Sequence, residues 1–336
     1  MTWLAWRQLR AQAATVAVAL AAIAVLLGLT GPRLAGLTGD VLAQLTPTDR
    51  FLYWAGIAVV GIAPALLGAF WGAPLVAREL EAGTHRLTWS QGITRGRWLA
   101  ARLGLAVLGA ALVAGLLTLA VGWWAAPLDG ITGDQRGSLP IRLSPVPFGM
   151  RGVVPVAYAV FAVVLGTVVG MLLRRSVAAL ALTLALVGLT QIAVPLWVRP
   201  HLLPPERVVV AVTADRLDGL SVGPDRAVLT LHTGHRGDWL LSSRTLDPAG
   251  RPTATLPDWF PRCLPGPGSG GPNSGPARQA MRDCLARLDA AGYRQEIVYQ
   301  PESRFWPLQW AESALYLAGA GLLAGFGLWW LRRRLT

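Results

Sequence analysis

The feature that most constrains this chain is a set of six long windows without a charged residue. They cover residues 11–32, 51–77, 103–128, 152–173, 176–198 and 313–331. About 20 apolar residues cross a bilayer, and a charge at mid-span costs roughly 2.5–3.5 kcal/mol. Buried helices of soluble proteins are the alternative, but they run to about 10–14 residues and carry charges on one face. The windows therefore predict six transmembrane helices.

A cleaved signal peptide is the alternative for the first window, because Arg7 and Arg10 precede it. The apolar run is about twice as long as a typical signal core, and no small-residue cleavage site closes it. We therefore expect an uncleaved first span.

The basic residues are all arginines, and charged residues are few. The net charge is +12, but only 14% of the residues are charged, against about 25% in an ordinary soluble domain. A nucleic-acid-binding protein needs a dense basic surface, so no nucleic-acid partner is expected. Without lysine the chain cannot carry a lysine Schiff base or the lysine of a P-loop. If the protein transports a substrate with ATP, a partner must hydrolyse the ATP.

The arginines also predict the orientation in the membrane. Six spans place both termini on one side, where short segments hold 12 of the 30 arginines, opposed only by Glu79 and Glu81. The longer segments on the other side hold 18 arginines and 16 acidic residues. Because short cytoplasmic segments carry an excess of arginine, both termini are expected in the cytoplasm and residues 199–309 outside.

Residues 199–309 have the composition of a small folded domain. Arg207–Thr213, Ala227–Thr233, Trp239–Arg244 and Glu296–Tyr299 are rich in β-branched or alternating apolar residues and predict strands. Ala277–Ala291 has apolar residues at helical spacing and predicts an amphipathic helix. The expected fold is an α-helical polytopic membrane protein with six transmembrane helices, both termini cytoplasmic, and a small α+β extracellular domain.

The two cysteines, Cys263 and Cys284, bracket a Gly/Pro/Ser-rich tract in this domain. An extracellular location is oxidising, and a bridge that closes this loop would stabilise the fold by lowering the entropy of the unfolded chain. Two unpaired thiols are the alternative. We favour a disulfide.

Motifs of catalysis and metal binding are missing from the sequence. His232 and His235 form H-x-x-H, but no Cys or carboxylate at metal-ligand spacing accompanies them. We expect no metal site, no catalytic residue and no cofactor bound by this chain.

The spans carry few polar residues that a substrate could contact. Paired carboxylates of a proton-coupled transporter are missing, and the nearest acid is Glu312 at the outer edge of the sixth window. Candidate pathway residues are Thr183, Thr190 and Gln191, for which helix hydrogen bonding is the alternative explanation.

The segment between the second and third windows has the pattern of a helical elbow, over residues 77–98. Span two can continue through Glu81, with Gly83 as a left-handed stop. Thr84 can cap a short helix over residues 85–91, and Thr94 can cap the start of span three. The residues that the short helix would present to a cytoplasmic partner are Arg86, Leu87 and Trp89.

This elbow also carries a recognisable motif. A run of the form R-E-x-E-x-G-T, followed by Arg about ten residues later, is matched by Arg78, Glu79, Glu81, Gly83, Thr84 and Arg95. It resembles the first intracellular loop of ABC transporter permeases of the six-span ABC-2-type, or type V, exporter class. Many members carry Lys near the start of span three, where this chain has Arg102, which keeps the charge.

Two other parts of the chain are similar to that family. Residues 1–10 resemble its amphipathic connecting helix, with Trp3, Leu4 and Trp6 toward lipid. The large insertion between spans five and six lies where the family places its outer elaboration, and the final stretch from Tyr299 to Arg334 resembles bacterial members with a large outer domain. The resulting division is 1–10, then spans one to five over 11–198, the outer domain over 199–309, and the sixth span with its Arg tail over 310–336.

The resemblance implies the membrane subunit of an ATP-driven exporter in a bacterial plasma membrane. Its partners would be an ABC ATP-binding subunit, which holds ATP and magnesium, a second permease copy, and a small amphipathic or hydrophobic substrate. The short helix of the elbow would be the coupling helix. The docking residues implied are Glu79, Glu81, Gly83, Thr84, His85, Arg86, Leu87, Trp89 and Arg95.

Two other classes remain as alternatives. A membrane sensor or receptor with an extracellular ligand-binding domain would need fewer spans and a larger cytoplasmic module. A secondary transporter is disfavoured by the missing carboxylates and by the lack of a repeat between the first and last three spans.

Two G-x-x-x-G pairs permit close helix approach at a dimer interface. They are Gly166/Gly170 in span four and Gly321/Gly325 in span six. In a chain with 38 glycines such pairs also arise by chance.

Overall fold

The computed structural model describes residues 2–37, 44–82, 94–129, 139–222, 227–231, 233–234, 237–260 and 275–334. The chain divides into two compact units. Unit 1 comprises residues 1–131, 144–202 and 306–336, and unit 2 comprises residues 132–143 and 203–305. Unit 2 is therefore built from two insertions into the chain of unit 1.

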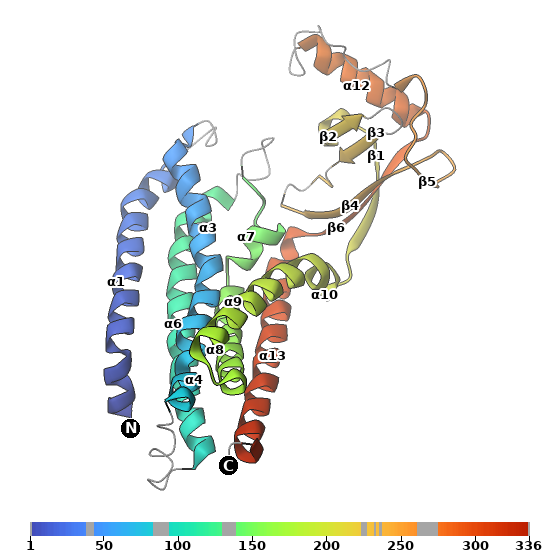
Figure 1. The fold of residues 1–336 in the computed structure, drawn as a ribbon. Coiled ribbons are helices and arrows are strands. Elements are labelled where there is room, and N and C mark those ends of the chain that lie inside the picture. The colour runs from blue at the N-terminus through green and yellow to red at the C-terminus, as the bar shows by residue number, and fades with distance from the viewer. Residues whose placement is uncertain are drawn as a thin grey trace. The chain divides into compact units, whose positions relative to one another are not determined.

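Unit 1 is helical (Figure 1). Its helices are α1 (Thr2–Ala35), α3 (Pro47–Leu67), α4 (Pro74–Glu81), α6 (Arg95–Asp129), α7 (Pro145–Gly149), α8 (Val154–Leu173), α9 (Ser176–Ala193), α10 (Arg199–Leu202) and α13 (Phe305–Arg334), with π-helical turns η1 (Gly68–Gly72) and η2 (Val194–Val198). Six segments are long and apolar enough to cross a membrane, namely Ala14–Ala35, Pro47–Glu81, Gly96–Asp129, Val154–Leu173, Ser176–Leu202 and Glu302–Arg333. Each overlaps one charge-free window, so the six predicted spans are confirmed.

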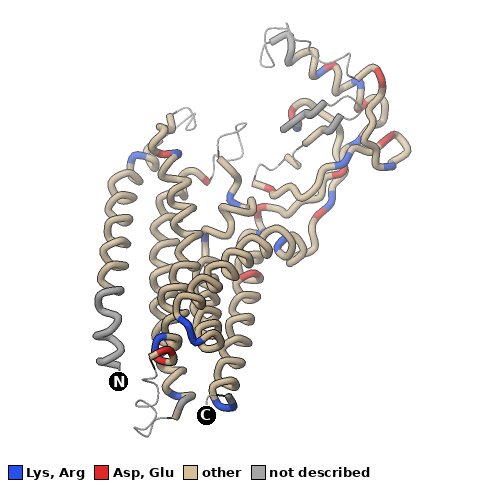
Figure 2. The backbone as a smooth tube through the Cα atoms, viewed as in Figure 1, with Lys and Arg blue, Asp and Glu red and all other residues tan. Residues whose placement is uncertain are grey.

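The long helices run back and forth between two ends of the bundle, and both chain termini lie at the same end (Figure 1). At that end, called the loop end here, α4 and α8 finish and α6 and α9 begin. At the opposite end, called the insertion end, α6 and α10 lead into the insertions and α13 returns from them. Charged residues gather toward these two ends (Figure 2), as the windows require.

The helix α8 lies at the centre of unit 1. Of its apolar window 72% is buried, compared with 11% for α1. Small residues let it approach η1 backbone to backbone, because a Cβ on Gly166 would collide with the carbonyl oxygen of Gly68. A Cβ on Gly170 would likewise collide with the carbonyl oxygen of Ala73. The first G-x-x-x-G pair is therefore used within the chain.

Local sequence explains two features of the first two spans. The helix α3 begins with a capping box in which Thr46 and Asp49 bond each other's backbone N–H groups, and Pro47 fits the first helical position. The helix α1 runs without a break from Thr2 to Ala35, across the boundary expected after Arg10.

Unit 2 is a small α+β unit. Its elements are β1 (Glu206–Ala211), η3 (Ala214–Arg216), β2 (Leu217–Val222), β3 (Ala227–Leu231), β4 (Trp239–Leu246), β5 (Pro252–Thr253), α12 (Gly275–Ala290), β6 (Arg294–Gln300) and η4 (Glu302–Arg304). The strands form one antiparallel sheet in the order β1-β6-β4-β5 and a separate β2-β3 pair. Leu285 and Leu288 of α12 pack with Ile297 of β6 and Leu231 of β3 in its core. The four predicted strands and the helix are confirmed, whereas β2 and β5 were not anticipated.

Candidate functional site

Both ends of the predicted elbow are described, over residues 77–82 and 94–98, whereas residues 83–93 lie outside the described residues. Span two ends at Glu81, and span three begins at Arg95, directly after Thr94, as the sequence predicted. Gly83, Thr84, His85, Arg86, Leu87 and Trp89 lie outside the described residues. The side chain of Arg95 is also outside the description.

Glu79, at the end of α4, pairs with Arg102 of α6. The guanidinium of Arg102 also lies 5.0 Å from the centroid of the Trp98 ring. Both charged side chains are partly buried, with about a fifth of their surface exposed: 21% for Glu79 and 23% for Arg102. The pair therefore connects spans two and three within the chain.

Glu81 contacts a different helix. Its Oε2 accepts a hydrogen bond from the backbone N–H of Ser176 at 3.1 Å and another from the Ser176 hydroxyl at 2.7 Å. Ser176 is the first residue of α9, so the carboxylate satisfies a free N–H and lies at the positive end of the helix dipole. Glu81 therefore connects span two to span five. We call these two interactions the loop-end contacts.

An apolar cluster supports the loop-end contacts. Val76 of α4, Trp98 and Leu99 of α6, Met171 of α8 and Leu331 of α13 are buried together. Four spans thus share one core at the loop end. A displacement of α4 must be passed to its neighbours, since close-packed interiors are not continuously deformable.

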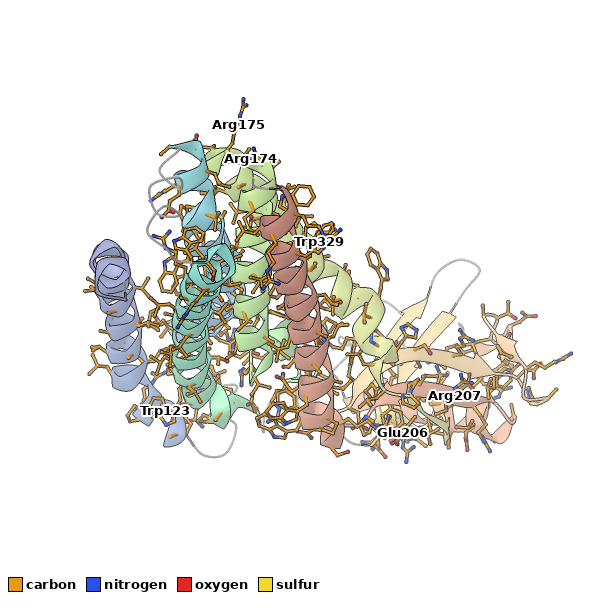
Figure 3. All side chains as sticks on the ribbon, turned by 90° about the horizontal axis from the view of Figure 1, so that it is seen from below. Trp123, Arg174, Arg175, Glu206, Arg207 and Trp329 are labelled. Atoms are coloured by element: carbon orange, nitrogen blue, oxygen red, sulfur yellow. The ribbon has the colours of Figure 1, made fainter. Side chains whose placement is uncertain are left out.

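Exposed arginines surround the same end. They are Arg78, Arg97, Arg174, Arg175, Arg332 and Arg333. Arg174 and Arg175 form the turn between α8 and α9, and Figure 3 shows Arg175 pointing away from the helices. Within the part of the chain that the structure describes, no ion pair joins these six to an acidic residue.

Three arginines near the insertion end are paired with carboxylates. Arg33 binds Asp49, linking α1 to α3. Arg151 donates to both carboxylate oxygens of Asp129 at 2.5 and 2.7 Å, linking the turn before α8 to the end of α6. These arginines therefore differ from the six exposed arginines of the loop end, for which the described residues show no ion pair.

A third pair at the insertion end is fully buried and was missed in the sequence. Arg199 of α10 donates from Nε to Oε2 of Glu312 at 2.6 Å and from Nη2 to Oε1 at 3.0 Å. Both side chains have 0% exposure. The Tyr158 hydroxyl of α8 donates to Glu312 as well. From the sequence, Arg199 was assigned to the outer domain, whereas the structure places it in unit 1. The sequence feature that could have indicated this is that Arg199 directly follows a long apolar window.

The three candidate pathway residues take part in helix packing. The Thr183 hydroxyl is buried and donates to the Ala179 carbonyl of its own helix. The Thr190 hydroxyl donates to the Val187 carbonyl of α9. The Gln191 side chain donates to the Gly61 carbonyl of α3 at 3.1 Å. A pathway role for these residues stays a prediction.

Cys284 is fully buried in the core of unit 2, with its Sγ 3.9 Å from the Phe260 carbonyl oxygen. Cys263, its predicted partner, lies outside the described residues. Phe260, which contacts Cys284, is the last described residue before Cys263 and precedes it by three residues. The disulfide between Cys263 and Cys284 stays a prediction. Among the described residues, no group of three or more His, Cys, Asp or Glu side chains converges on a metal position.

Comparison with known proteins gives one match. Residues 3–199, which include the first five spans and the elbow, match the family described as "ABC-2 membrane transporter related". No curated protein and no solved structure matches the chain.

Proposed function

The chain belongs to the ABC-2 membrane transporter related family, and from this premise we propose that it is the permease of an ATP-driven exporter. Members of this family are membrane subunits and work with an ABC ATP-binding partner. In this proposal the partner holds ATP and magnesium, and the elbow over residues 77–98 contains the coupling helix that docks on it. The substrate is a small amphipathic or hydrophobic molecule.

The observation that carries this proposal is the pair of loop-end contacts. A coupling elbow must pass a displacement from the partner to the spans, and its stem needs polar attachments as well as apolar packing. Glu79 attaches α4 to α6, and Glu81 attaches α4 to the start of α9. These two residues therefore act inside the chain in this proposal, and the docking surface is left to the residues beyond Glu81.

The charges of the two ends support a cytoplasmic loop end. Among the described residues no ion pair joins the exposed arginines of the loop end to an acidic residue, whereas Arg33, Arg151 and Arg199 at the other end are each paired with a carboxylate. Excess positive charge marks the cytoplasmic side. The loop end and both termini then face the cytoplasm of a bacterial cell, and the insertion between α10 and α13 is extracellular, where a Cys263–Cys284 disulfide would persist.

A second copy of the chain completes the transporter in this proposal. Gly166 and Gly170 are occupied by contacts to η1 and α4. At Gly321 and Gly325 of α13, no described atom lies within 4 Å of an added Cβ. The α13 pair is thus the one with room for another helix.

The test of this proposal is co-expression with an ABC ATP-binding protein from the same gene cluster. We expect the two chains to co-purify and to show vanadate-sensitive ATPase activity that neither chain shows alone. Efflux of a hydrophobic dye from cells should require both chains. A monodisperse chain that binds no such ATPase, but binds an extracellular ligand or exchanges protons, would assign it to a receptor or a secondary transporter.

A further inference from the structure

The buried pair Arg199–Glu312 joins three helices of unit 1 at the insertion end. Arg199 lies on α10, Glu312 on α13, and Tyr158, which donates to Glu312, on α8. The remaining donor group of Arg199 is used too, because Nη1 bonds the Pro145 carbonyl at 2.7 Å. The guanidinium also lies 4.3 Å from the centroid of the Phe148 ring. Each nitrogen of the Arg199 guanidinium thus has a hydrogen-bond acceptor.

A buried ion pair is a poor choice for stability alone. Apolar residues of similar volume usually stabilise a core as well or better, because the pair must repay the desolvation of two charges. What the pair does provide is a contact that can open at low cost, since both charges regain hydration when they separate. An ionisable residue within a membrane-spanning segment is by default a candidate for a functional site.

The helix that carries Arg199 follows an irregular, π-helical turn. Arg199 directly follows the π-helical turn η2, and such turns are frequent at functional sites. The same continuous segment begins at Ser176, where Glu81 caps α9. One helical rod, Ser176–Leu202, therefore connects the loop-end contacts to the buried pair.

We propose that Arg199, Glu312 and Tyr158 form a latch that holds the insertion end closed at rest and opens when α9 moves. The opening step rests on the proposed function, because the partner ATPase would move α9 through Glu81. The closed state of the latch at rest does not depend on the proposed function. When the latch opens, Arg199 and Glu312 separate and become hydrated, and the space beneath them becomes accessible from outside.

The test uses a cysteine reporter at Ser313, the residue after Glu312. Its hydroxyl is buried, and no described residue bonds it. Ser313→Cys should react slowly with a membrane-impermeant maleimide at rest. A second reporter, Ala179→Cys, is fully buried near the other end of α9. Global unfolding exposes both positions, whereas latch opening exposes only the first.

Arg199→Met leaves Glu312 buried without its partner and should raise Ser313→Cys labelling by about tenfold, as an opening equilibrium predicts. Labelling of Ala179→Cys should stay at its resting rate. Arg151→Met is the matched control, because it removes an ion pair at the same end that does not involve the continuous segment Ser176–Leu202. If Arg199→Met does not insert, Tyr158→Phe makes the same comparison by removing one hydroxyl.

The second arm uses the complex with its ATPase. Labelling of Ser313→Cys should rise during ATP turnover in the wild-type background. The double variant Arg199→Met plus Glu312→Met should fold, and its Ser313→Cys labelling should stay at the resting rate during turnover. Two methionine side chains gain no hydration energy when they separate, so the latch should stay closed.

Equal labelling at rest and during turnover would overturn the opening step. An equal rise at both reporters in Arg199→Met, or at neither, would overturn the latch. If no ATPase binds, the proposed function fails, while the first arm still decides the latch.

Discussion

The close contact between α8 and η1 gives a prediction whose size follows from the structure. Gly166→Ala adds one methyl group that would collide with the carbonyl oxygen of Gly68, which is backbone and cannot rotate away. Overpacking of this kind costs about 1–3 kcal/mol. The Thr167 hydroxyl donates to the Val163 carbonyl of its own helix at 2.8 Å, so its longer 3.3 Å contact with the Gly72 carbonyl adds little to this cost. We expect a destabilisation of about 1–3 kcal/mol.

Gly321→Ala is the matched control. It makes the same chemical change in a long apolar helix, but no described atom lies within 4 Å of the added methyl group. Alanine is about 1 kcal/mol better than glycine in a helix interior, so this variant should be unchanged or slightly stabilised. Detergent-solubilised chains would be unfolded with increasing SDS and followed by circular dichroism. Equal free energies of unfolding for the two variants would refute the intrachain packing of α8 on η1.

Three further predictions concern coupling, self-association and the cysteines. Glu81→Gln should leave ATPase binding intact but lower the stimulated ATPase activity, because the cap of α9 weakens; loss of binding instead would make Glu81 a docking residue. Gly321→Leu should reduce cross-linking between two copies of the chain, and unchanged cross-linking would place the interface elsewhere. Cys263 and Cys284 should resist alkylation without reductant and gain two labels after reduction, which mass spectrometry would detect; labelling without reductant would reject the disulfide.

The sequence predicts the spans well because their cause is local. A window without charge is a property of consecutive residues, and each window became part of a membrane-length helix. The strands of unit 2 were predicted for the same reason, since β-branched residues cluster in them. The strand β2 was missed because its sequence, LDGLSV, contains Asp and Gly, which are depleted in strands. The two-residue β5 is too short to leave a pattern.

The contacts between distant residues were not predictable from local pattern. Glu79 and Glu81 were singled out by the motif, but their partners Arg102 and Ser176 are 23 and 95 residues away. A partner outside the chain was the equally reasonable expectation. The buried pair is similar, because Arg199 and Glu312 are 113 residues apart and are brought together only by the packing of α10 against α13.

The measurement that tests the central claim most directly is ATPase stimulation by a chain that lacks residues 85–91. A deletion of equal length within the Gly/Pro/Ser tract, residues 265–271, is the control. We predict that the first variant inserts into the membrane but no longer stimulates its ABC ATP-binding partner, while the second stimulates it as the intact chain does. Full stimulation of the vanadate-sensitive activity without residues 85–91 would contradict the account of coupling through the elbow.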